Sequence, residues 1–252
     1  IKVIWGNKYR IITFTFVAAF ISVIYALSLP NIYHADALLA PAGNEDSGGM
    51  SRLAGQFGGL ASLANISFSN DVVNKSELGL EVLYSRKFIR EFVERHKIAP
   101  QLMAVDYWDP DTRKLVFDSD IYDEKSKTWV NEDGPPINRD ILESFLDALI
   151  IQENKKTQFL RLGFKHKSPE IAAEWTSLVI KDLNDAIRLQ DINEAESSIA
   201  YLRQQIEASP LTDLKTLFYN LIQAQTETMM LANVREEYVF KTIDPATIPE
   251  FK

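Results

Sequence analysis

Carboxylates are the side chains of this sequence that come closest to a catalytic arrangement. Between residues 106 and 124 they recur at short spacing, a pattern typical of a glycosidase acid pair or of a calcium loop. The run from Asp118 to Glu124 lacks the spacing and the central glycine of an EF-hand. A solvated acidic face is therefore the simpler interpretation. The clustered carboxylates are Glu45, Asp46, Asp106, Asp109, Asp111, Asp118, Asp120, Asp123, Glu124, Glu236 and Glu237.

Other catalytic signatures are missing from the sequence. It contains no cysteine, which excludes disulfides, thiol catalysis and cysteine-based metal sites. The three histidines, His34, His96 and His166, lie far apart, and no phosphate-loop, HExxH or GxSxG motif occurs. We therefore expect a protein that is not an enzyme and that has no catalytic residue, cofactor or metal.

Three tryptophans have different expected roles. Trp108 and Trp129 lie in turn-rich segments, where an aromatic ring is able to stack on a sugar, and they are the two residues at which we expect glycan contact. Trp175 lies on the inward face of a long predicted helix, so we expect it in the core.

The overall composition limits the kinds of molecule that the protein is expected to bind. The formal net charge is −8 and no cluster of Lys and Arg occurs, so nucleic acid is not an expected partner. The 252 residues are enough for one large domain or two small ones. The first residue is Ile rather than Met, from which we expect a fragment of a longer gene product.

The elements that position these residues begin with an uncharged run of 19 residues, Ile11 to Leu29. As a helix it would extend about 28 Å, close to the roughly 30 Å hydrocarbon thickness of a bilayer. Three basic residues precede the run, whereas no Lys or Arg follows it before Arg52. The positive-inside rule then predicts a transmembrane helix over 11–29, with residues 1–10 in the cytoplasm and the rest of the chain outside it.

Two other interpretations of this run stay open. It is also consistent with a secretory signal peptide, because Ala35-Asp36-Ala37 resembles a cleavage site, although the apolar part of signal peptides is usually about 7–15 residues long. A fully buried core helix is the other alternative, and it does not explain why the basic residues lie on one side only.

The sequence pattern of residues 30–167 predicts a membrane-proximal α/β domain with a mixed sheet. Alternation with period two indicates strands, and apolar spacing of three and four indicates helices. A glycine-rich stretch at 42–70 predicts a loop with short helical turns that pack either on this domain or on a partner. The predicted elements are a strand at 30–40, a helix at 70–96, short strands within 101–137, a helix at 137–149, and a hairpin of strands at 148–152 and 158–166.

Residues 168–237 predict a helical hairpin. Ser168, Pro169 and Glu170 provide an N-cap, a proline at the first helical position and an acid in the first turn, and about 40 residues then pass before Pro210. A second helix follows over 211–237, and its short connection favours an antiparallel pair. The first helix carries apolar residues spaced as in a coiled-coil seam, which we expect to be covered by neighbouring copies. The seam residues are Ile192, Ala195, Ile199, Leu202 and Ile206.

The pattern of residues 238–252 predicts a final strand, at 238–243, followed by a proline-containing segment that leads back toward the membrane. A strand that follows the return helix is placed to pair with the strand at 30–40. We therefore expect the segment that leaves the membrane and the segment that returns to it to lie side by side.

Short motifs form an ordered set over nearly the whole chain. Pro30-x-x-Tyr33-x-Ala35 follows the predicted membrane helix, a Gly/Ala/Ser stretch occupies 59–64, and a helical segment begins at 85–89. Another motif, Ser168 to Trp175, starts the long helix. The most specific is I-D-P-A-x-x-P-E-x-K at 243–252, with Asp244, Pro245, Pro249 and Glu250. Together these motifs resemble those of the Wzz-type chain-length determinants, also called bacterial polysaccharide co-polymerases.

This resemblance implies both a fold and a function. It implies an α+β fold with a transmembrane helix, a periplasmic base and a long protruding helix, in ring-shaped homo-oligomers held in the bacterial inner membrane. The 243–252 motif stands in that family just before a second membrane helix, which lies beyond this sequence. The implied function is to set the length of a surface polysaccharide of the O-antigen type. The implied partners are membrane lipid, the growing polysaccharide and a Wzy-type polymerase, for which the protein acts as a scaffold.

Two rival functions come from other classes. One is a periplasmic polysaccharide-processing enzyme that uses an acidic pair from residues 106–124. The other is a membrane-anchored adaptor or sensor domain whose layout is similar but which does not depend on polysaccharide.

Overall fold

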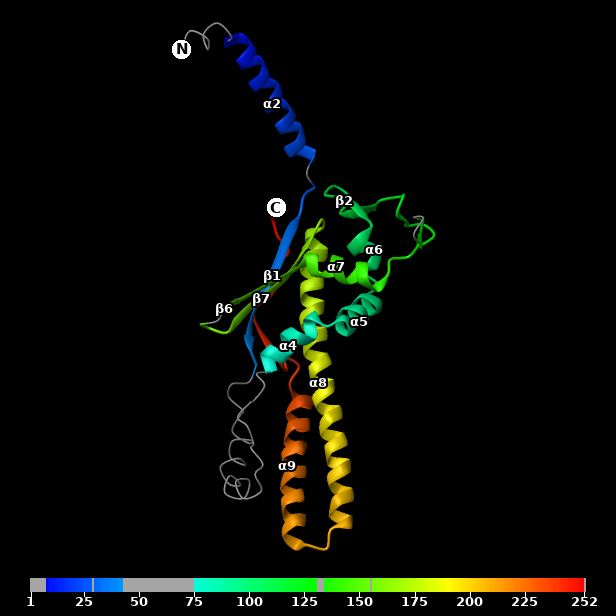
Figure 1. The fold of residues 1–252 in the computed structure, drawn as a ribbon, viewed down its shortest axis with the longest axis vertical. Coiled ribbons are helices and arrows are strands. Elements are labelled where there is room, and N and C mark those ends of the chain that lie inside the picture. The colour runs from blue at the N-terminus through cyan, green and yellow to red at the C-terminus, as the bar shows by residue number, and fades with distance from the viewer. Residues whose placement is uncertain (1–7, 29, 43–74, 131–133, 155, 252) are drawn as a thin grey trace.

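The computed structural model describes residues 8–28, 30–42, 75–130, 134–154 and 156–251. The molecule is elongated, with helix α2 (Lys8–Ser28) at one end, an α/β body in the middle and a helical hairpin at the other end (Figure 1). The predicted loop at 42–70 and the motif at 59–64 lie outside the described residues, apart from Ala42. The side chains at both ends of α2 are outside them as well.

A four-stranded sheet forms the centre of the body, in the order β6-β7-β1-β8. The predicted hairpin is confirmed as β6 (Leu149–Asn154) and β7 (Phe159–His166), and the predicted pairing of the first strand with the last is confirmed as β1 (Tyr33–Pro41) and β8 (Phe240–Asp244). The prediction of a mixed sheet is wrong, because all three pairings are antiparallel. The long excursions keep the strand direction: β6 runs the same way as β1 with β7 between them, and β8 runs the same way as β7 with β1 between them.

One long helix covers a face of this sheet. Helix α8 (Pro169–Ala208) has 40 residues, and it begins as predicted, with Ser168 as N-cap and a proline in the first turn. Its first half packs on β1 and β7, where Thr176 Oγ1 donates to the Ala35 carbonyl at 3.0 Å. The second half projects beyond the sheet beside α9 (Thr212–Val234), which confirms the predicted antiparallel hairpin (Figure 1).

Shorter helices close the body. The helical pattern predicted over 70–96 is confirmed for the described residues, as two helices, α4 (Lys75–Tyr84) and α5 (Arg86–His96). They are separated by Ser85, whose backbone is extended and whose Oγ caps α5 by accepting from the Phe88 amide at 3.2 Å. Helices α6 (Ala99–Met103) and α7 (Asn138–Ala148) complete the layer, the second close to its predicted bounds.

The predicted short strands within 101–137 are present as two small hairpins. The first pairs β2 (Val105–Asp109) with β3 (Lys114–Phe117), and the second pairs β4 (Tyr122–Asp123) with β5 (Thr128–Trp129). In Figure 1 the first of these lies at the end of the body from which α2 departs.

Aromatic rings hold the core together between the sheet, α8, α5 and α7. Phe92, Phe145, Phe164 and Trp175 form a chain of edge-to-face contacts, with ring centroids 5.2–5.7 Å apart. All four are buried, so the expected core position of Trp175 is confirmed. Such pairs contribute about 0.5–1.5 kcal/mol each beyond the area that they bury.

Within the part of the chain that the structure describes, no helix is both long enough and apolar enough to span a bilayer.

Candidate functional site

The protruding hairpin of α8 and α9 is the first candidate site, because the predicted seam lies on it. Ala195, Ile199 and Ile206 are only 1%, 9% and 9% exposed, and Ile192 and Leu202 are half-buried. This burial occurs within a single chain, along the half of α8 beside which α9 runs (Figure 1). The seam therefore closes the hairpin itself. Contact of the same residues with neighbouring subunits stays a prediction.

Other apolar side chains of the hairpin do face outward. In α9 the single fully buried residue among those described is Ala232, although the helix is rich in Leu, Met and aromatic residues. These outward residues were not predicted as a site. The signal that would have found them is that apolar residues lie on every face of α9 and not on one stripe. The exposed set is Leu189, Tyr201, Leu214, Tyr219, Leu221, Met230, Leu231 and Val234.

The base of the hairpin is fixed by a buried amide. Asn184 of α8 accepts from the amides of Val239 and Phe240 through Oδ1, at 2.7 and 2.9 Å, and donates from Nδ2 to the Phe240 carbonyl at 3.1 Å. The side chain thus satisfies three backbone groups of the chain that returns from α9. This places β8 beside β1.

A second cluster of polar contacts, which we call the Lys75–Asp191–Tyr238 lock, lies about two turns further along α8. Lys75 Nζ, Asp191 Oδ2 and the Tyr238 hydroxyl are within 2.6–2.8 Å of one another. Burial acts to lower the pKa of Lys75, but its hydrogen bonds to Asp191 and Tyr238 outweigh burial and raise it. Burial and the hydrogen bond to Asp191 raise the pKa of Tyr238. The lysine therefore stays charged near neutral pH, and the lock joins α4, α8 and the return segment.

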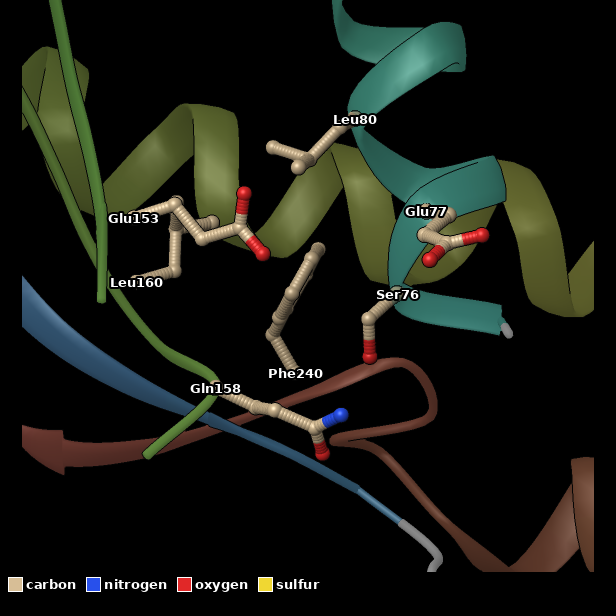
Figure 2. Close-up of a pocket in the computed structure, with 7 residues that line it drawn as sticks. All are labelled: Ser76, Glu77, Leu80, Glu153, Gln158, Leu160 and Phe240. Atoms are coloured by element: carbon tan, nitrogen blue, oxygen red, sulfur yellow. The ribbon is translucent and has the colours of Figure 1, made fainter. Parts of the chain in front are cut away.

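A pocket of about 350 Å³ lies between α4, the β6–β7 turn and β8 (Figure 2). Its apolar side is formed by Leu80, Leu160 and Phe240, and Glu77, Glu153, Gln158 and Ser76 provide the polar groups. Among the described residues neither glutamate forms an ion pair, so the pocket offers hydrogen-bond acceptors to a hydroxylated or cationic group. Sequence reasoning missed it, because its residues come from three separate segments.

The acidic residues of 106–124 act as turn formers. Asp109 accepts from Thr112 Oγ1 and the Asp111 amide at 2.8 and 2.9 Å, and these bonds lower its pKa. Asp123 accepts from Ser126 Oγ at 2.7 Å and from the Lys125 amide at 3.0 Å, with the same effect on its pKa. A general acid near neutral pH needs a raised pKa, so these two carboxylates are poor candidates for acid catalysis.

Metal ligation finds no support in the described part of the chain, which contains no group of three or more His, Asp or Glu side chains able to hold an ion. His34 is exposed on β1, whereas His96 lies 2.9 Å from Asp182, which Arg95 also contacts. His166 is buried, and it accepts from the Ser168 amide at 2.9 Å while Nε2 donates to the Gln101 carbonyl at 3.0 Å. Each histidine thus has a structural environment of its own.

The two tryptophans of the glycan prediction lie in different hairpins. Trp108 packs edge-on against Tyr33 at 5.8 Å, and Trp129 packs edge-on against Tyr122 at 5.3 Å. Both rings are half-buried, so each presents part of its surface. Trp108 Nε1 is buried, and within the described residues no acceptor reaches it. Glycan contact at either ring stays a prediction.

Two of the sequence motifs come together in space. Tyr33 and the buried Ala35 lie in β1, and Asp244 ends β8, where it pairs with Leu38. Because β8 runs antiparallel to β1, the chain after Asp244, with Pro245, Pro249 and Glu250, continues in the direction of the start of β1, and Figure 1 marks the C-terminal end near that strand. Pro30 precedes that strand and is exposed. The prediction that the entering and returning segments lie side by side is confirmed.

The family comparison agrees with the motif resemblance over part of the chain. Residues 1–94 match the family model described as Wzz, "Chain length determinant protein". Among solved structures, a fragment of WzzB, a polysaccharide co-polymerase from Salmonella Typhimurium, is similar with 13% sequence identity and a TM-score of 0.31, covering 87% of this chain and 97% of that one. No curated protein matches the chain.

Proposed function

We propose that this chain regulates the length of a surface polysaccharide of the O-antigen type without catalysing a reaction, because its residues 1–94 match the model of the Wzz chain length determinant family. The family match is the observation that carries the proposal. The described residues add a consistent picture, in which turn-forming aspartates take the place of an acid pair and a rigid hairpin stands on a well-packed body.

The mechanism that we propose is geometric. An oligomer of the chain acts as a scaffold that holds a Wzy-type polymerase and the growing glycan together for a characteristic time, and that time sets the length of the product. The hairpin suits this role because Asn184 and the Lys75–Asp191–Tyr238 lock fix its base to the sheet. A scaffold transmits length information only if its parts keep a constant arrangement.

The oligomer part of the proposal is supported by the outward side chains of the hairpin. Tyr201, Tyr219, Met230 and Val234 are each more than half exposed. Exposed apolar groups gathered on a protruding element are typical of association surfaces. Neighbouring hairpins of the same chain would cover them in a homo-oligomer.

The membrane part of the proposal depends on sequence. The 19 uncharged residues 11–29 have the length of a bilayer span, and basic residues precede them. Within α2 the described side chains of 13–25 are all exposed, and most of them are apolar. We propose that α2 anchors the chain in the bacterial inner membrane, in contact with lipid, with its body in the periplasm.

A gene deletion tests the proposed function against its two rivals. Loss of the modal ladder of surface polysaccharide lengths, restored by the full gene on a plasmid, is the expected result. An unchanged ladder would refute length control and leave an adaptor or sensor domain. Glycan cleavage by the purified chain, abolished by Asp109→Asn, would instead establish the polysaccharide-processing enzyme.

A further inference from the structure

An aromatic cluster lies where α2 meets the body. It consists of Ile32, Tyr33, Tyr107 and Trp108, and we call it the collar cluster. Tyr33 opens β1, five positions after Ser28 ends α2, and its ring meets Trp108 of β2 edge-on, with the ring planes at 77°. Figure 1 shows β2 at the end of the body nearest to α2. Two segments that are about 75 residues apart in the sequence thus supply one surface at this junction.

Contacts within the chain leave part of the collar cluster exposed and one of its polar groups without a partner. Tyr107 is 54% exposed and Ile32 is 43% exposed. Trp108 Nε1 is buried, and no described residue accepts its hydrogen. Buried tryptophan N–H groups normally find an acceptor, so this N–H marks the hairpin as incompletely satisfied by the described residues.

The position of the cluster identifies its partner. Tyr33 follows the end of the uncharged run at Leu29 by four residues, so chain length alone keeps it within about 14 Å of the point where the run ends. The polar layer on each side of a bilayer is roughly 5–8 Å deep. Tyrosine and tryptophan concentrate in that layer, because their rings are apolar while their O–H and N–H groups reach lipid oxygens.

The charges around the cluster determine the kind of lipid. Lys167 Nζ is occupied by the carbonyls of Val105 and Asp106, at 2.7 and 2.8 Å, and Arg113 pairs with Glu170 at 3.1 Å. Asp106 and Asp111 are exposed on the same hairpin. The exposed Lys114 of this hairpin is balanced by Asp106, Asp109 and Asp111. The surface therefore has no net excess of positive charge with which to attract anionic headgroups.

We propose that the collar cluster is a second membrane contact, which docks the β2–β3 hairpin into the headgroup layer of zwitterionic lipid beside α2. This inference rests on the proposed membrane anchor. It assigns a role to Trp108 different from glycan contact. With two contacts instead of one, the body is held at a fixed tilt to the bilayer, so the hairpin of α8 and α9 projects in a fixed direction.

Fluorescence quenching in lipid tests the docking. The full chain is placed in phosphatidylcholine nanodiscs with Trp108 as the sole tryptophan, through Trp5→Phe, Trp129→Phe and Trp175→Phe, and the quencher is a headgroup spin-labelled lipid. We expect at least about twofold quenching, because the indole lies in the headgroup layer. The matched control keeps Trp129 as the sole tryptophan and should be quenched much less. Quenching of Trp108 no stronger than that of Trp129 would overturn the proposal.

Two further variants keep the result interpretable. If Trp175→Phe disturbs the core, the comparison is made instead between the Trp5→Phe chain and the same chain with Trp108→Phe added, where the proposal requires the quenched fraction of the emission to disappear. A Phe20→Trp chain with an acyl-chain quencher reports the insertion of α2 separately. Quenching at residue 20 but not at Trp108 would overturn the docking alone, and quenching at neither would refute the anchor as well.

Lipid composition supplies the last test. Replacing a third of the phosphatidylcholine by phosphatidylglycerol should leave the quenching of Trp108 unchanged. Quenching that appears only with the anionic lipid would overturn the assignment to a zwitterionic surface.

Discussion

The body and the protruding hairpin of this protein differ in how completely they bury their side chains. The largest fully buried side chains, from Trp175 and Phe92 to Leu183 and Ile187, all belong to the body. Beyond Ile187, α8 buries Ala195, Ile199 and Ile206 alone, against one partner helix. A sheet covered by helices excludes water from whole side chains, whereas two helices side by side bury one narrow stripe.

This difference separates stability from assembly. Full burial of a large apolar side chain contributes about 1.5–3 kcal/mol, so the body holds most of the folding free energy. The hairpin retains apolar side chains that one chain cannot cover. We therefore expect damage to the body to unfold the protein, and damage to the hairpin to change its shape and association.

The largest expected effect contrasts two phenylalanines. Phe164 of β7 is fully buried between Phe145 and Trp175, whereas Phe218 of α9 is half-buried. Phe164→Ala should cost about 3–5 kcal/mol of the free energy of unfolding, and Phe218→Ala clearly less. Urea unfolding followed by circular dichroism measures both. Equal losses of unfolding free energy in the two variants would contradict the proposed difference in packing between body and hairpin.

The next effect concerns the closest backbone approach in the sheet. A Cβ on Gly163 of β7 would overlap the carbonyl oxygen of Ala35 and lie 2.7 Å from the Asp36 Cα. Gly163→Ala should therefore force β1 and β7 apart and cost roughly 1–3 kcal/mol, by the same unfolding measurement. Gly134→Ala is the control, because nothing lies within 4 Å of that position and the cost there is limited to its backbone strain. A neutral Gly163→Ala would mean that the strands pack less tightly than described.

The junction of the two regions should respond locally, at the base of the hairpin. Asn184→Ala leaves the amides of Val239 and Phe240 without their acceptor, which should cost about 1–3 kcal/mol. The loss should appear as faster hydrogen exchange in β8 and at the end of α9, while β6 and β7 remain protected. Asn193→Ala, at an exposed position of the same helix, provides the control. Unchanged exchange in β8 would show that the clamp does not hold the return segment.

The smallest effect is a dependence on pH that belongs to the body. Burial is the main cause that lowers the pKa of His166, and the nearby Lys167 acts in the same direction. The unfolded chain then binds the proton more readily, so the contribution of His166 is complete above its unfolded pKa of about 6.5 and is lost as pH falls below it.

His166→Gln isolates this contribution, because an amide is able to accept from Ser168 and donate to Gln101 without titrating. The melting temperature of the wild-type chain should fall more than that of the variant between about pH 7.5 and 5.5. Parallel curves would assign the pH dependence to other groups.

Periodic elements were the part of the structure that the sequence predicted well. The start of α8 followed from Ser168 and Pro169, and the β6–β7 hairpin followed from alternation on either side of a polar turn. The break between α4 and α5 was missed, because the apolar spacing continues across Ser85 and one side-chain cap decides the local backbone. The strand directions were missed too, since they depend on long-range topology that no local pattern contains.

The candidate site was harder to predict, because its properties arise from tertiary contacts. The seam of α8 was recognised, but its spacing did not reveal that α9 of the same chain covers it. The clustered aspartates resembled a catalytic or metal-binding group in the sequence. Hydrogen bonds such as the one that Thr112 donates to Asp109 identify them as turn formers. The pocket and the collar cluster join residues from distant segments, which spacing along the chain does not report.

The central claim is that the shape of the hairpin, and not reactivity, controls polysaccharide length. The most direct test is the ladder of surface polysaccharide lengths in a deletion strain that expresses the chain with Ile199→Glu and Leu202→Glu. These changes place charges in the seam and should open the hairpin while the sheet stays protected from hydrogen exchange. We predict that this variant, present in the membrane at wild-type level, fails to restore the modal length that the wild-type gene restores. A wild-type ladder from a chain whose hairpin is shown to be open would contradict the account.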